Sequence, residues 1–137
     1  ERLATRIDAP LAQLVAAKGG PADRADVTYA QMITPDGLKT IATYADWVAP
    51  EMTLVLPRDA EGRTTAPSPL VADAHAAGLK VVVWTLRAEN AFLPVERRRG
   101  DDTAGHGDLT GYAAAFAEAG VDALFSDFPA LARTTAP

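Results

Sequence analysis

Short apolar runs alternate with amphipathic segments along most of this chain, and that order restricts the folds open to it. The apolar runs lie at residues 9–15, 46–49, 80–86 and 121–125, and each has the length of a buried strand. The segments between these runs have the periodicity of amphipathic helices. Alternation of this kind predicts an α/β fold, with a parallel sheet and helices packed outside it. Four such strands fit a small open sheet or half of an eight-stranded barrel, and the pattern alone leaves both open.

Helix start signals indicate where the amphipathic segments begin. Thr34-Pro35 combines a side chain that caps free N–H groups with a proline suited to the first helical position, and Ser68-Pro69 repeats this signal. Asp108 is the predicted cap of a later helix. Residues 53–56 fit a further short strand or an extended loop, and residues 87–107 fit a long charged loop.

Composition argues against several classes of protein. The 137 residues carry a net charge of -5, whereas a nucleic-acid binder needs a basic patch for phosphate contacts. The dense basic cluster Arg97-Arg98-Arg99 is flanked by acidic residues and is predicted to be a solvated loop. The chain has no cysteine, which removes disulfides and thiol nucleophiles. Its most apolar run, residues 79–86, is far shorter than the ~20 residues that span a membrane.

Three segments decide between the open sheet and the half-barrel: residues 34–46, 74–90 and 119–129. The second ends in WTLRAEN at residues 84–90, and the third contains GVDALFSDFP at residues 120–129. In this order and spacing they resemble the closing section of the glycerophosphodiester phosphodiesterase family, particularly its periplasmic and secreted bacterial branch. The resemblance covers most of the chain.

The resemblance implies a (β/α)₈ TIM barrel of which residues 1–137 form the C-terminal half, with about four parallel strands and outer helices. Members of the family hydrolyse glycerophosphodiesters to glycerol 3-phosphate and an alcohol, and so are phosphoric diester hydrolases. They use a divalent cation, Ca²⁺ or Mg²⁺, held by carboxylates, and two histidines that act as acid and base. The resemblance also implies a periplasmic or secreted location.

The family's catalytic motifs lie in the first half of its barrel, as His-Arg-Gly, Glu-x-Asp and His-Asp sequences. None of these occurs in this chain, and Glu89-Asn90 does not replace them. We therefore expect no catalytic and no metal-binding residue within residues 1–137. The expected partners are a small glycerophosphodiester and the N-terminal half of the same barrel, which is absent from this chain. The half-barrel alone should be inactive.

Three residues are candidate substrate-binding residues. Trp84 ends the clearest strand, and by resemblance it lines the pocket for the glycerol or alcohol part of the substrate; the alternative is a core aromatic. Gln13 lies in the first apolar run and needs hydrogen-bond partners, either in the active-site cleft or in a structural network. Arg87 follows the strand of Trp84 and can face a phosphate, or can pair with Glu89 or a loop carboxylate.

Three further polar residues favour non-catalytic roles, which for the two histidines are structural or solvent-exposed. Asp127 follows the last strand and is predicted to cap the turn before Pro129 rather than to serve the pocket. His75 lies in a predicted outer helix, away from the barrel mouth. His106 lies in a Gly-His-Gly loop with no partner evident from the sequence. A catalytic base must first have the right geometry, and neither histidine follows a strand.

Two other functions fit the same sequence. One is a sphingomyelinase-D-like phospholipase on the same barrel, and the other is a non-catalytic half-barrel remnant. The presence or absence of the Glu-x-Asp and histidine motifs upstream would separate the enzymes from the remnant.

Overall fold

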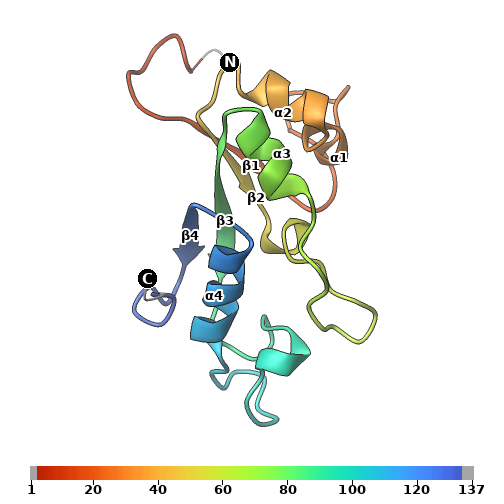
Figure 1. The fold of residues 1–137 in the computed structure, drawn as a ribbon, viewed down its shortest axis with the longest axis vertical. Helices are drawn as coiled ribbons and strands as arrows, with labels where there is room; N and C mark the ends of the chain where they lie inside the picture. The colour runs from red at the N-terminus through yellow and green to blue at the C-terminus, as the bar shows by residue number, and fades with distance from the viewer. Residues whose placement is uncertain (1–2, 134–137) are drawn as a thin grey trace.

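The computed structural model describes residues 3–133, and among them four strands form one parallel sheet (Figure 1). The strands pair in the order β1-β2-β3-β4, so each lies beside its neighbour in the sequence. Their bounds are Ala12–Val15 for β1, Trp47–Pro50 for β2, Lys80–Leu86 for β3 and Ala123–Ser126 for β4. This topology confirms the predicted α/β fold and is that of half a (β/α)₈ barrel.

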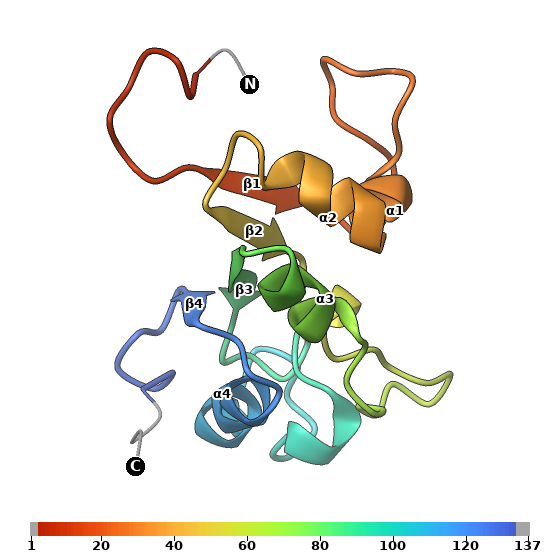
Figure 2. The ribbon, with the colours of Figure 1, turned by 45° about the horizontal axis from the view of Figure 1, so that its top comes forward.

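Helical segments connect the strands and lie along one side of the sheet (Figure 2). The α-helices are α1 (Tyr29–Met32), α2 (Pro35–Ile41), α3 (Leu70–Ala76) and α4 (Leu109–Glu118), and the 3-10 helices are η1 (Met52–Leu54) and η2 (Val95–Arg97). Each crossover between parallel strands carries at least one helix, as this topology requires.

Two of the three predicted cap residues cap their helices through a side-chain hydrogen bond. Thr34 Oγ1 accepts a hydrogen bond from Gly37 N–H at 3.2 Å, and Asp108 Oδ1 accepts one from Gly111 N–H at 3.1 Å. Ser68 behaves differently, because its hydroxyl donates to the Leu54 carbonyl at 2.6 Å. It ties η1 to the start of α3 rather than capping the helix at the usual position.

Two segments differ from the sequence prediction. Residues 53–56 are neither strand nor extended loop, because Glu51 accepts a hydrogen bond from Thr53 N–H and starts the helical turn of η1. The short helix α1 was not predicted. Thr28 and Gln31 form a capping box there, in which each side chain accepts a hydrogen bond from the other's backbone N–H.

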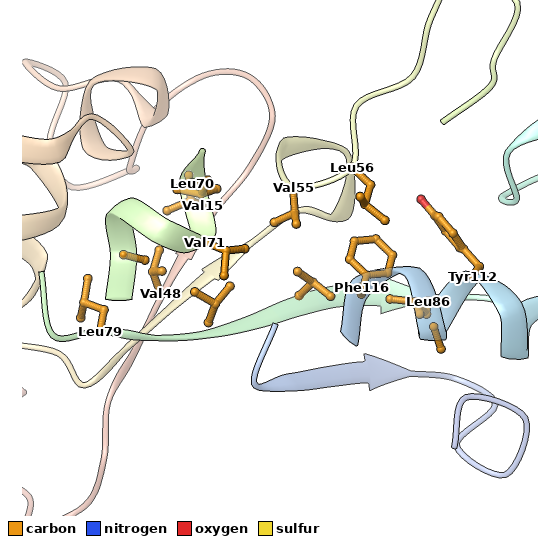
Figure 3. Close-up of a cluster of buried hydrophobic side chains, with 14 of the residues drawn as sticks. Val15, Val48, Val55, Leu56, Leu70, Val71, Leu79, Leu86, Tyr112 and Phe116 are labelled. Carbon is orange, nitrogen blue, oxygen red and sulfur yellow. The ribbon is translucent and has the colours of Figure 1, made fainter. Parts of the chain in front are cut away.

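The hydrophobic core lies between the sheet and the helices (Figure 3). Val15, Val48, Val81 and Val83 come from three strands, are fully buried, and belong to this core with Phe116 of α4. Alternate residues of a strand point to opposite faces, so these valines define the helix-covered face.

The opposite face of the sheet, called the inner face below, has no helix on it among the described residues. Register pairs Leu14 with Ala49 and Val82 with Ala123 on this face, and these four side chains lie outside the main core cluster, although Ala49 and Val82 are buried. Leu14 and Phe125 are 56% and 55% exposed on this face. An apolar face left open in this way is what half a barrel presents before its other half closes over it.

Candidate functional site

The carboxyl ends of the strands place three polar residues beside one another. Glu51 follows β2, Arg87 follows β3 and Asp127 follows β4. Because the strands are parallel, these positions share one edge of the sheet. In (β/α)₈ barrels that edge is the mouth, where the reacting groups are found.

Trp84 lies on the inner face near this edge. It pairs with Glu51 in a parallel bridge, in the same register that pairs Val48 with Val81, so its side chain points away from the core. Its indole Nε1 donates a hydrogen bond to the Ala49 carbonyl at 2.6 Å, and the side chain remains partly exposed. The ring is therefore held in one orientation on the face expected to become the barrel interior.

Arg87 pairs with Asp127, and not with Glu89, which the sequence suggested as a partner. Its Nε lies 2.8 Å from Asp127 Oδ2, and its guanidinium carbon lies 4.7 Å from the centre of the Phe92 ring. The prediction that Asp127 caps the turn before Pro129 is wrong. Ser126 Oγ accepts the hydrogen bond from Phe128 N–H at 3.0 Å, whereas the Asp127 carboxylate is paired with Arg87.

Gln13 faces away from the inner face of the sheet. It is the second residue of β1 and shares the face of Val15, on the side of the helices. Tyr44 Oη donates to its Oε1 at 3.0 Å, and its Nε2 donates to the Leu14 carbonyl at 2.9 Å. These bonds supply the structural network that was one of the two expectations for Gln13. They give no support to its role as a substrate-binding residue.

A cavity of about 680 Å³ opens on the same helix-covered side as Gln13. Its lining comes from β1, from α1 and α2, and from the loop that precedes them, including Arg24, Gln31 and Tyr44. It is therefore distinct from the mouth.

The two histidines take the roles expected of them, structural for His75 and solvent-exposed for His106. His75 Nε2 lies 2.9 Å from Asp122 Oδ2, which also accepts a hydrogen bond from Val81 N–H at 2.8 Å. The pair ties α3 to the start of β4, at the end of the sheet opposite the mouth. His106 has a ring partner that the sequence did not show, because Phe128 meets it edge-on at 4.8 Å between ring centres.

The loop between β3 and α4 is organised around Asn90, which is 3% exposed. Its Nδ2 donates to the carbonyls of Arg99 and Asp102, at 2.9 and 2.8 Å, and its Oδ1 accepts from Arg99 N–H. The sequence signal for this role is slight, because Asn90 looks like any polar loop residue until its burial is known.

The arginine cluster lies in a largely exposed loop of mixed charge, as predicted, and its side chains also make specific contacts. Arg97 Nη1 and Arg99 Nη2 lie 2.9 and 3.6 Å from the carboxylate of Asp108, and Arg98 Nε donates to the Leu93 carbonyl. The hydrogen bond from Gly111 N–H lowers the pKa of Asp108, and Arg97 and Arg99 lower it further against the opposing effect of burial. These groups fix the start of α4.

The mouth lacks a cluster of metal ligands among the described residues. Among residues 3–133, no three His, Asp or Glu side chains come together in a group that could hold a metal ion. The carboxylate of Glu51, directly after β2, is bonded to Thr53, and that of Asp127, directly after β4, faces Arg87. No helix among the described residues is long and apolar enough to cross a bilayer.

Comparison with known protein families decides the affiliation. The model of the glycerophosphoryl diester phosphodiesterase family matches residues 2–131. The chain belongs to this family. Its members are TIM barrels and phosphodiester hydrolases, so the parallel sheet of this phosphodiesterase chain is half of such a barrel. No curated protein matches the chain.

Proposed function

We propose that this chain is the C-terminal half of a metal-dependent glycerophosphodiester phosphodiesterase, which hydrolyses glycerophosphodiesters to glycerol 3-phosphate and an alcohol. The observation that carries the proposal is the inner face of the sheet. This face is apolar and partly exposed, and its carboxyl end carries Trp84 and Arg87 in a chain of the phosphodiesterase family. A flat aromatic and a guanidinium suit a substrate that joins a small alcohol to a phosphate.

The N-terminal half of the barrel is the proposed partner that covers this face. Leu14 and Phe125 are more than half exposed, and β1 and β4 each have a single pairing neighbour among the described residues. Closing the barrel would bury both side chains and pair both edges. In this arrangement the catalytic histidines and the carboxylates that bind Ca²⁺ or Mg²⁺ belong to that half.

The residues described do not fit a cation site by themselves. Glu51 and Asp127 are each engaged with a neighbour, and no third ligand accompanies them. We therefore derive no step of the reaction through a metal on this chain. Its own contribution is to hold the substrate, with Trp84 against the alcohol or glycerol part and Arg87 near the phosphate.

The resemblance of its motifs to the periplasmic and secreted branch supports a location outside the cytoplasm, which is also a proposal. Fractionation of cells that express the protein in its full natural length tests it directly. A protein found wholly in the cytoplasmic fraction would contradict it.

The reaction is tested with the protein in its full natural length and glycerophosphocholine as substrate. We expect release of glycerol 3-phosphate in a coupled assay, loss of turnover with a chelator, and recovery with Ca²⁺ or Mg²⁺. A cyclic phosphate product would instead indicate the sphingomyelinase-D-like reaction. A folded protein with no turnover on any glycerophosphodiester would indicate a non-catalytic barrel.

A further inference from the structure

The guanidinium of Arg87 is held from two sides at the mouth. Asp127 Oδ2 lies 2.8 Å from its Nε, and the Phe92 ring centre lies 4.7 Å from its central carbon. Among residues 3–133, no side chain or backbone group accepts a hydrogen bond from the terminal nitrogens Nη1 and Nη2. The Arg87 side chain is 43% exposed, so the guanidinium keeps a solvent-accessible surface.

Strand register directs this pair to the inner face. Leu86 pairs with Ser126, and Leu86 is fully buried in the core on the helix-covered side. The next residues along the two strands, Arg87 and Asp127, therefore point to the opposite face. Trp84, three residues earlier, lies on the same face, because the strand is irregular between Val83 and Leu86.

We infer that Asp127 is a positioning residue, which together with Phe92 fixes the Arg87 guanidinium so that its terminal nitrogens meet the phosphate of the substrate. This inference rests on the proposed function, from which the phosphodiester is taken. The terminal edge of a guanidinium offers parallel N–H donors that match two phosphate oxygens.

The physical reason for such a clamp is entropic. An arginine side chain that is free in solvent loses much of its rotamer freedom when it binds a ligand. Asp127 and Phe92 restrict the guanidinium before the substrate arrives, and they do so without occupying the donors that a phosphate needs. The alternative is that Arg87 and Asp127 form an ordinary exposed ion pair, which contributes little to stability and nothing to substrate binding.

The test uses the protein in its full natural length, with glycerol 3-phosphate as the titrated anion and glycerophosphocholine as the substrate. We expect Asp127→Asn to weaken glycerol 3-phosphate binding and to raise KM by about 3- to 10-fold, with kcat changed less. Asp127→Glu should restore most of the affinity. Combining Asp127→Asn with Arg87→Lys should add little to the loss caused by Arg87→Lys alone, because both changes act through one guanidinium.

A matched control is available on the outer surface. Asp36 forms an exposed ion pair with Lys39 on α2, at 3.0 Å, on the helix-covered side of the sheet. Asp36→Asn removes a comparable pair and should leave the Kd for glycerol 3-phosphate and KM unchanged.

Several results overturn the inference: an unchanged Kd in Asp127→Asn with only a lower Tm, a tighter Kd, or no binding of glycerol 3-phosphate by the unmodified protein. Failure of the proposed function gives a different result. In that case the unmodified protein hydrolyses no glycerophosphodiester, while calorimetric titration with glycerol 3-phosphate still measures the effect of Asp127 and Arg87 on anion binding.

Discussion

Trp84 is positioned by its backbone register and by the bond from its indole nitrogen to the Ala49 carbonyl. We expect Trp84→Ala in the full-length protein to lower kcat/KM for glycerophosphodiesters by an amount equivalent to about 1–3 kcal/mol, because an aromatic wall of the pocket is lost. Affinity for the divalent cation should stay nearly unchanged.

Trp84→Phe is the matched control, since it keeps an aromatic ring but removes the indole N–H. It should retain most of the activity if the ring face matters more than the hydrogen bond to Ala49. Unchanged kcat/KM in Trp84→Ala would show that this side chain only fills the barrel.

The sequence predicted the place of a residue well where nearby residues determine it, and poorly where a contact with a distant part of the chain determines it. The position of Trp84 follows from a strand that is evident in the sequence. The partner of Arg87 does not, because Asp127 lies 40 residues away and meets it only through the pairing of β3 with β4. The same holds for His106, whose ring contact with Phe128 joins a loop to the segment after β4.

At the level of elements, Asp108 joins the start of α4 to the preceding loop through its bonds to Gly111 and Arg97. We expect Asp108→Ala to lower the free energy of unfolding by about 1 kcal/mol or more, since it removes the cap. Asp108→Asn should cost less, because its side-chain oxygen can still accept from Gly111 N–H while the ion pairs are lost. Urea titration of the full-length protein measures both.

The cost of Asp108→Asn should also depend on pH. The pKa of Asp108 lies below its usual value in the folded protein, chiefly through the bond from Gly111 N–H, so its charged form is favoured by folding. That contribution is complete above the unfolded pKa of about 4 and is lost as the pH falls through the lower folded pKa. The difference between the original protein and Asp108→Asn should therefore shrink between about pH 5 and pH 2. A difference that stays constant over this range would contradict the assignment.

Elements with strong local signals were predicted well, and weak ones were not. The valine-rich strand at residues 80–86 and the capped helices after Thr34 and Asp108 are found where the sequence places them. The four-residue helix α1 was not predicted, because so short a segment shows no helical periodicity and depends on the capping box at its start. Residues 53–56 were misassigned, because the bond from Glu51 to Thr53 is not evident in an apolar pattern.

For the whole molecule, the open inner face predicts how isolated residues 1–137 behave. An exposed apolar face and two unpaired sheet edges favour association, so we expect the isolated chain to pair with itself or with the N-terminal half. Analytical ultracentrifugation checks this. Phe125→Lys should reduce self-association, whereas Leu131→Lys, which alters a 42% exposed side chain outside the strands, should not. A monodisperse monomer that unfolds cooperatively would count against the prediction.

The half-barrel architecture could be predicted because family motifs supplemented the strand–helix pattern, which alone left an open sheet equally acceptable. The inner face could not be mapped in advance. Which residues face inward depends on register and on the irregularity between Val83 and Leu86, and both emerge only when the strands pair.

The central claim is that residues 1–137 complete a phosphodiesterase barrel whose chemistry lies in the other half. Its most direct test is complementation, with purified residues 1–137 and the N-terminal half assayed separately and then mixed, using glycerophosphocholine and coupled detection of glycerol 3-phosphate. We predict no hydrolysis and no tight Ca²⁺ or Mg²⁺ binding by residues 1–137 alone, and cation-dependent turnover once the two halves are combined. Cation-dependent turnover by residues 1–137 alone would contradict the claim.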